Sequence, residues 1–164
     1  MLALGACGDN SSQSQSASAT KSAVAQPKQE NKIVDACTVV SEDFLKSQFS
    51  SIEGYDCKKG STNRFPFCSV QFKSAGVEYG LNVTIGIIGG ADEKTLDGSQ
   101  SYFIQKKSVE VLEGVGDKAY IRTNDGQISA VGNGNLIHVT LYKGMKPDLA
   151  LSKQMTNELL QKLK

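Results

Sequence analysis

This 164-residue sequence has one histidine, almost no excess of charge of either sign and no long apolar stretch. The one histidine, His138, cannot build a zinc site, because structural zinc takes four clustered Cys or His ligands and catalytic zinc usually three. With 18 Lys and Arg against 17 Asp and Glu, the formal net charge is +1, so no nucleic-acid partner is indicated. No stretch approaches the roughly 20 apolar residues of a membrane-spanning helix. The composition therefore predicts no metal, no cofactor and no nucleic acid.

Sequence patterns typical of catalysis are missing too. Asp and Glu are scattered at spacings that suggest neither a carboxylate pair nor a calcium loop, and there is no Cys-x-x-Cys redox motif. Glycines at positions 114, 116, 132 and 134 occur in turns, without the strand–loop–helix context of a phosphate-binding loop. The sequence thus predicts a protein that is not an enzyme.

The most informative residue that is present is Cys7. Leu4-Gly5-Ala6-Cys7 is typical of a bacterial lipobox, in which a signal peptidase cuts before a cysteine that is then acylated. The three residues ahead of this motif are too few for the charged and apolar regions of an export signal. We therefore interpret residues 1–7 as the remnant of a lipoprotein signal peptide that begins further upstream.

The segment after Cys7 favours the same interpretation. Residues 8–32 are dominated by Ser, Gln, Ala, Lys and Asn, so they cannot bury enough apolar surface to offset chain entropy and should form a disordered tether. Two or more acyl chains, palmitate among them, anchor a protein stably in a membrane. Gly8 stands where Asp would favour inner-membrane retention in enteric bacteria, which indicates the outer membrane.

Cysteine usage fits an oxidising compartment such as the periplasm. Without Cys7, three cysteines remain, so one disulfide and one leftover thiol are expected, and three pairings are open. Cys68 shares a strand face with apolar neighbours, and Cys37 precedes a helix start beside aliphatic residues, so both should lie near the core. This favours Cys37–Cys68, a link that contributes about 3–4 kcal/mol in the chain-entropy model. Cys57–Cys68 is the alternative.

Residues 33–164 suffice for one domain and not two. Strict period-two alternation over residues 77–87 predicts a long strand with one buried face. Ser41 is a plausible helix N-cap, and Asn124-Asp125-Gly126 is a strong hairpin-turn signal.

The same pass along the chain gives the other elements. Helices are predicted over residues 41–50, 93–107 and 148–163, and strands over 67–73, 77–87, 109–112, 118–122, 127–131 and 135–142, with an irregular loop at 54–66. We therefore predict an α+β fold, with helices packed on a mainly antiparallel sheet of five to six strands in a single domain.

The predicted loop at 54–66 carries the candidate binding residues. Lys58, Lys59 and Arg64 form a small basic cluster, and Phe65 lies alongside it. This combination is suited to phosphate or lipid headgroups. The alternative interpretation is the solvated flank of a loop.

Three short motifs carry a resemblance. Asp35-Ala36-Cys37-Thr38-Val39-Val40 opens the domain, Cys68-Ser69-Val70-Gln71-Phe72 places a second cysteine at the start of a strand, and Gly114-Val115-Gly116-Asp117 forms a turn. Over roughly residues 33–142, the chain resembles small bacterial envelope lipoproteins of unknown function. The resemblance implies a Cys37–Cys68 disulfide and brings no established activity. Cys57 departs from the pattern.

These features predict a lipoprotein of the bacterial cell envelope, anchored to the membrane through Cys7. Its non-enzymatic domain, on the periplasmic side or at the surface, would bind another envelope component: a protein, a glycan or a lipid headgroup. The rival hypothesis is a thiol-based or hydrolytic envelope enzyme that uses Cys57 or His138.

Overall fold

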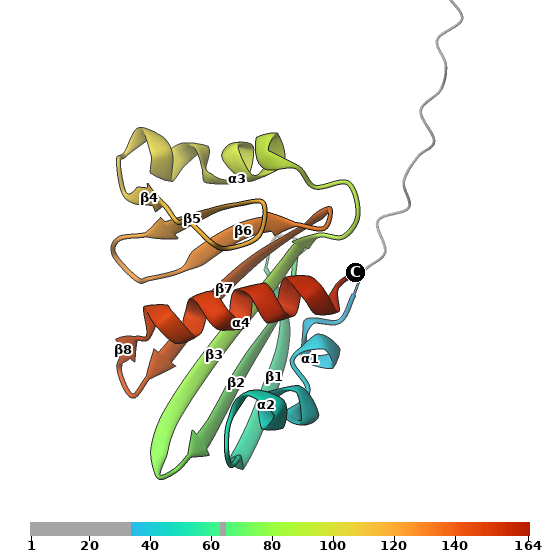
Figure 1. Ribbon diagram of the computed structural model, residues 1–164, viewed down its shortest axis with the longest axis vertical. Coiled ribbons are helices and arrows are strands. Elements are labelled where there is room, and N and C mark those ends of the chain that lie inside the picture. The colour runs from blue at the N-terminus through green and yellow to red at the C-terminus, as the bar shows by residue number, and fades with distance from the viewer. Residues whose placement is uncertain (1–33, 63–64) are drawn as a thin grey trace, which may run out of the picture.

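Antiparallel strands make up one sheet in the computed structural model, which describes residues 34–62 and 65–164 (Figure 1). Cys7, the segment 8–32 and Arg64 lie outside the described residues. The strand order is β1-β2-β3-β7-β6-β5-β4, with β8 beside β7. The strands are β1 (Glu53–Thr62), β2 (Phe65–Ser74), β3 (Val77–Ile87), β4 (Val109–Val111), β5 (Lys118–Arg122), β6 (Ile128–Gly132), β7 (Asn135–Lys143) and β8 (Lys146–Pro147).

Alternation along the central strands produces a buried face, as the period-two pattern predicted. Leu81, Val83 and Ile85 of β3 are at most 2% exposed. Each pairs with a buried residue of β7, and the intervening positions point to the other side of the sheet. The fold class is α+β, as expected.

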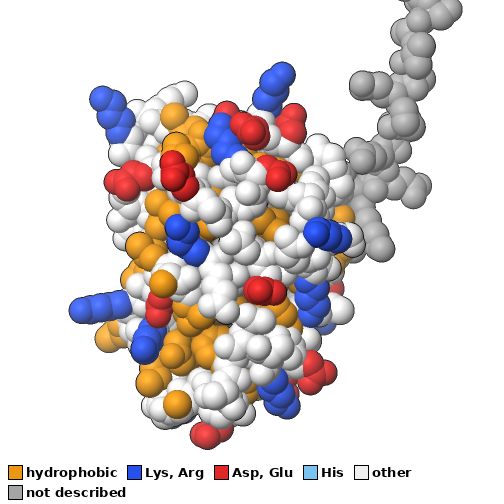
Figure 2. All heavy atoms as spheres, viewed as in Figure 1, with side chains coloured by type: hydrophobic (Ala, Val, Ile, Leu, Met, Phe, Trp, Pro, Cys, Tyr) orange, Lys and Arg blue, Asp and Glu red, His pale blue; other side chains and the backbone are white. Residues whose placement is uncertain are grey.

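Helices pack on both faces of this sheet, but unevenly. The helices are α1 (Ala36–Val39), α2 (Glu42–Gln48), α3 (Glu93–Gln105) and α4 (Leu149–Lys162). The main core joins α1, α2 and α4 to one sheet face, and Figure 1 shows α4 crossing that face. We call it the helix-covered face. Figure 2 shows this side of the molecule, with acidic and basic side chains interspersed rather than segregated by sign.

The remaining helix, α3, packs on the opposite face. Leu96 of α3 clusters with Val131 and Leu136, which alternate along β6 and β7 with residues of the main core. Asp97 fixes the helix further by accepting hydrogen bonds from the Tyr120 hydroxyl (2.9 Å) and the Lys118 Nζ (3.0 Å) of β5. Because α3 sits over β5 and β6, it leaves the β1–β3 part of this face without a helix among the described residues. We call that part the open face.

Two predictions about the elements were wrong: the number of strands and the irregular loop at 54–66. The sheet has eight strands rather than five to six, because the segment 54–66, predicted as a loop, contributes most of β1 and the start of β2, and the two-residue β8 was missed. Tertiary pairing overrides the poor strand propensity of the glycines and charged residues here: β1 is an edge strand held in register by β2. The helix bounds agree within two residues at each end, apart from the unpredicted short α1. No helix in the described part of the chain is long and apolar enough to cross a bilayer.

Candidate functional site

Lys58 and Lys59 of the predicted basic cluster do not lie on one surface. Lys58 and Lys59 are consecutive in β1, so their side chains point to opposite sides of the sheet. The Lys58 Nζ lies 3.5 Å from a carboxylate oxygen of Asp56, and the Lys59 Nζ lies 2.6 Å from one of Asp35. The hydrogen bond from Lys59 lowers the pKa of the Asp35 carboxyl. Each lysine thus has its own acidic partner.

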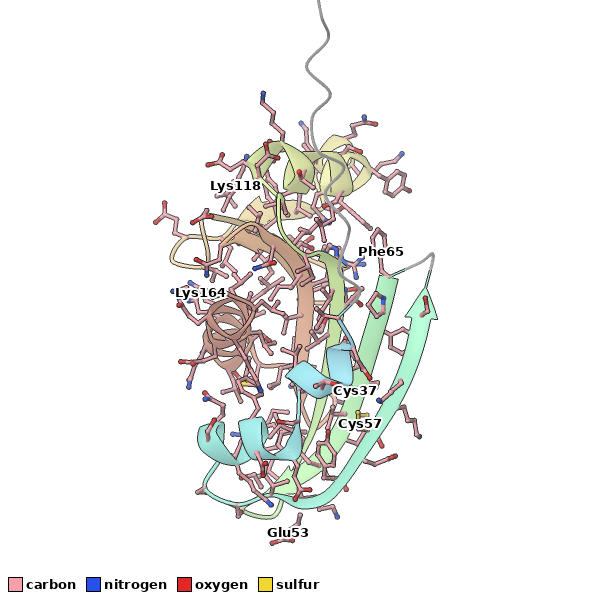
Figure 3. The ribbon with its side chains drawn as sticks, turned by 90° about the vertical axis from the view of Figure 1, so that its right-hand side faces the viewer. Cys37, Glu53, Cys57, Phe65, Lys118 and Lys164 are labelled. Atoms are coloured by element: carbon pink, nitrogen blue, oxygen red, sulfur yellow. A yellow bond between two sulfur atoms is a disulfide. The ribbon has the colours of Figure 1, made fainter. Side chains whose placement is uncertain are left out.

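Phe65, the apolar member of the predicted binding set, begins β2 and is 41% exposed. Figure 3 places it at the opposite end of the hairpin from Glu53, the first residue of β1. The exposed Phe65 ring therefore lies at the end of the β1–β2 hairpin where the chain turns from β1 into β2.

His138 lies on β7, where its side chain is partly buried. Burial, and secondarily the positive charge of Arg122, lower the pKa of its imidazole to about 4. Its Nδ1 lies 2.8 Å from the hydroxyl oxygen of Ser129, the residue opposite it on β6. His138 is therefore neutral at neutral pH, and it occupies the face opposite the main core, which contains its strand neighbours Ile137 and Val139.

Cys57 lies on the helix-covered face, beside the disulfide that joins Cys37 to Cys68. This disulfide is the pairing that the sequence favoured. The Cys57 Sγ is 3.0 Å from the Cys68 Sγ. Since His138 points to the other side of the sheet, Cys57 and His138 do not form a catalytic pair.

The open face carries a groove with a volume of about 580 Å³. It extends over β2 and β3 and is bounded by β1 and by the β7–β8 hairpin. Ser69 and Gln71 reach it from β2, Asn82 from β3 and Tyr142 from β7. None of the side-chain hydrogen bonds within residues 34–62 and 65–164 uses these four side chains, so their polar groups face the groove without a protein partner.

A glycine forms the floor of the groove. Gly80 of β3 lies between Gln71 and Tyr142 in the strand register, and a Cβ added there would meet no atom within 4 Å. The missing side chain therefore leaves the space that the flanking side chains enclose. At one end, the Lys73 Nζ lies 3.3 Å from a carboxylate oxygen of Glu78, which pairs the charges nearest the groove.

The period-two alternation over residues 77–87 places Gly80 and Asn82 on the outward side of the strand, but alternation alone gives them no role. The signal was present in the neighbouring strand, since Ser69 and Gln71 alternate with buried residues in the same way. The short turn between β2 and β3 sets Ser69 opposite Asn82. Aligning the two strands about that turn would have shown one polar face.

No protein-family model matches this sequence, and neither the curated proteins nor the solved structures contain a match to it.

Proposed function

We propose that this protein is an envelope lipoprotein, anchored through Cys7, whose domain binds a neutral ligand rich in hydroxyl and amide groups, such as a glycan chain of the cell envelope. The observation that carries the proposal is the groove on the open face, which presents polar side chains without protein partners. Ligand sites are typically concave, with a small number of polar groups that fix orientation.

The chemistry of the lining favours an uncharged polar ligand. The side-chain amides of Gln71 and Asn82 each offer donors and an acceptor, which match sugar hydroxyl and acetamido groups. Tyr142 adds a half-buried aromatic ring with a polar tip, suited to the apolar face of a sugar. The charges at the rim, Lys73 and Glu78, neutralise one another, which disfavours an anionic lipid headgroup.

The position of the groove suits a tethered protein. The described chain begins at Val34, directly before α1, which packs on the helix-covered face. The groove lies on the other side of the sheet. The point where the tether enters the domain therefore does not obstruct the groove.

The test is calorimetric titration of the full chain, carrying Cys7→Ser so that it is not acylated, with glycan strands released from peptidoglycan. Gly80→Gln adds a side chain to the groove floor, at a position where an added Cβ meets no atom within 4 Å. Gly98→Gln is the matched control, because Gly98 is an exposed α3 position with equally open surroundings.

Wild type and Gly98→Gln should bind alike, and Gly80→Gln should bind at least about tenfold more weakly, a loss of about 1.4 kcal/mol. Equal binding by Gly80→Gln would remove the groove as the site. Absence of binding by the wild type would remove the glycan, and binding to vesicles containing phosphatidylglycerol instead would assign the ligand to lipid.

A further inference from the structure

Three sulfur atoms meet at the edge of the sheet. The Sγ atoms of Cys37, Cys57 and Cys68 all lie within 4.8 Å of one another. Figure 3 shows Cys37 on α1 and Cys57 on β1 next to each other on the helix-covered side. Cys37 and Cys68 are joined, and Cys57 keeps a free thiol. A nucleophile therefore stands in contact with a disulfide in the same chain.

Strand register produces this contact. Lys59 is the Cα partner of Cys68, and Cys57 is the partner of Val70, so Cys57 and Cys68 are diagonal neighbours on one face of a strand pair. Diagonal neighbours in an antiparallel pair lie within reach of each other's side chains. Cys37 approaches the same sulfur from α1 above the sheet, so Cys68 has two cysteines within range and is bonded to one.

We propose that Cys57 exchanges with the Cys37–Cys68 disulfide, so that the chain interconverts between a Cys37–Cys68 isomer and a Cys57–Cys68 isomer. The Cys57 thiol loses its proton, and the thiolate attacks the Cys68 sulfur. A Cys57–Cys68 bond forms, the Cys37–Cys68 bond breaks, and Cys37 leaves as a thiolate that takes up a proton. One disulfide and one thiol are present before and after, so no oxidant or reductant is required.

Geometry directs the attack to Cys68. The Cys57 Sγ is 3.0 Å from the Cys68 Sγ. Cys57 is half-buried, so its thiol also remains within reach of solvent bases that remove its proton.

Exchange would change what the crosslink holds. The Cys37–Cys68 bond fastens α1 to the second strand across 31 positions of sequence. A Cys57–Cys68 bond would instead fasten β1 to β2, across 11 positions. After exchange, α1 would be held by its buried residues, by the Tyr55 hydroxyl that donates to the Val40 carbonyl at 3.0 Å, and by the Lys59–Asp35 ion pair.

Peptide mapping can distinguish the isomers directly. Trypsin cleaves after Lys32, Lys46, Lys58, Arg64 and Lys73, so the three cysteines fall in separate peptides, residues 33–46, 47–58 and 65–73. The full chain with Cys7→Ser is held at about pH 8 without added thiol, so that thiolate forms. It is then alkylated with N-ethylmaleimide and mapped without reduction.

The expected map contains both linkages, 33–46 with 65–73 and 47–58 with 65–73. In the second species, the alkyl label moves from Cys57 to Cys37. A map that contains only the Cys37–Cys68 linkage, with the label confined to Cys57, would overturn the proposal.

Single variants give an independent reading. Cys37→Ser in the same background should form Cys57–Cys68 on exposure to oxidised glutathione, whereas Cys57→Ser should keep Cys37–Cys68 and take up no label. Alkylation of both Cys57 and Cys68 in a folded Cys37→Ser protein would also overturn the proposal. Should Cys37→Ser not fold, the wild-type map decides.

Discussion

β6 is buried at every one of its five residues, whereas no described side chain of β1 is fully buried. The difference arises from helix placement: α3 and α4 enclose β6 from both sides, while β1 is an edge strand beside the open face. The two candidate sites, the groove and the three sulfurs, both involve the β1–β3 part of the sheet. β6 thus has no exposed face, whereas the β1–β3 part of the sheet keeps the polar side chains of the groove and the Cys57 thiol partly exposed.

The largest expected effect separates core side chains from exposed ones. Ile128 of β6 is fully buried, so Ile128→Ala should lower the free energy of unfolding by about 4 kcal/mol, because it removes apolar contacts and leaves a cavity. Phe65→Ala, at an exposed ring of β2, should cost less than about 1 kcal/mol. Urea unfolding followed by circular dichroism measures both. Equal losses of stability would show that the Phe65 side chain is packed as tightly as that of Ile128.

A smaller effect comes from His138 on β7, which pairs with both ends of the sheet. Its folded pKa of about 4 lies below the ordinary histidine pKa of 6.5, so the unfolded chain binds more protons between these values. Stability is therefore complete above pH 6.5 and falls as the pH drops toward 4, by about 2 kcal/mol at pH 5.

The matched variant for this pH effect is His138→Gln, which keeps a polar side chain opposite Ser129. Urea unfolding at several pH values should give a flatter profile for His138→Gln than for the wild type between pH 6.5 and 5. Parallel profiles would contradict the assignment to His138, because the shared loss would then come from other groups.

The smallest effect compares two glycines with open surroundings, one in each region. Gly98→Ala in the exposed middle of α3 should raise the free energy of unfolding by about 0.8 kcal/mol, since alanine favours a helix more than glycine does. Gly80→Ala on the open face should change it by less than about 0.5 kcal/mol, because the added methyl meets no neighbour. Thermal unfolding of the two variants measures both changes in stability. A loss of stability in Gly80→Ala would mean that the groove floor is less open than described.

The sequence predicted the elements that local patterns define better than it predicted the edge strand β1. Period-two burial along β3 and the Ser41 helix cap are local patterns, and the structure has both. β1 carries Gly60, Asp56 and consecutive lysines, which are typical of loops, and only pairing with β2 makes it a strand. Local pattern cannot report such pairing, so this strand was missed.

The groove could be predicted from the sequence only in part, for the same reason. Outward polar positions on β3 could be read from alternation, but the groove also needs β1 and the β7–β8 hairpin, whose positions depend on strand order. Cys57–Cys68 was only the alternative disulfide in the sequence analysis, because the contact between the two residues depends on the β1–β2 register, which a segment interpreted as a loop does not provide.

The location of the disulfide determines how the domain would bear a mechanical load. A force applied to the chain ahead of Cys37 reaches β2 through the covalent bond to Cys68, so α2 and β1, which lie between the two cysteines, carry none of it. β2 and β3, the next strand paired with it, then carry the pull. Exchange to Cys57–Cys68 would move the first covalent link to position 57, so that α1 and α2 would pass the load to the sheet only through noncovalent contacts.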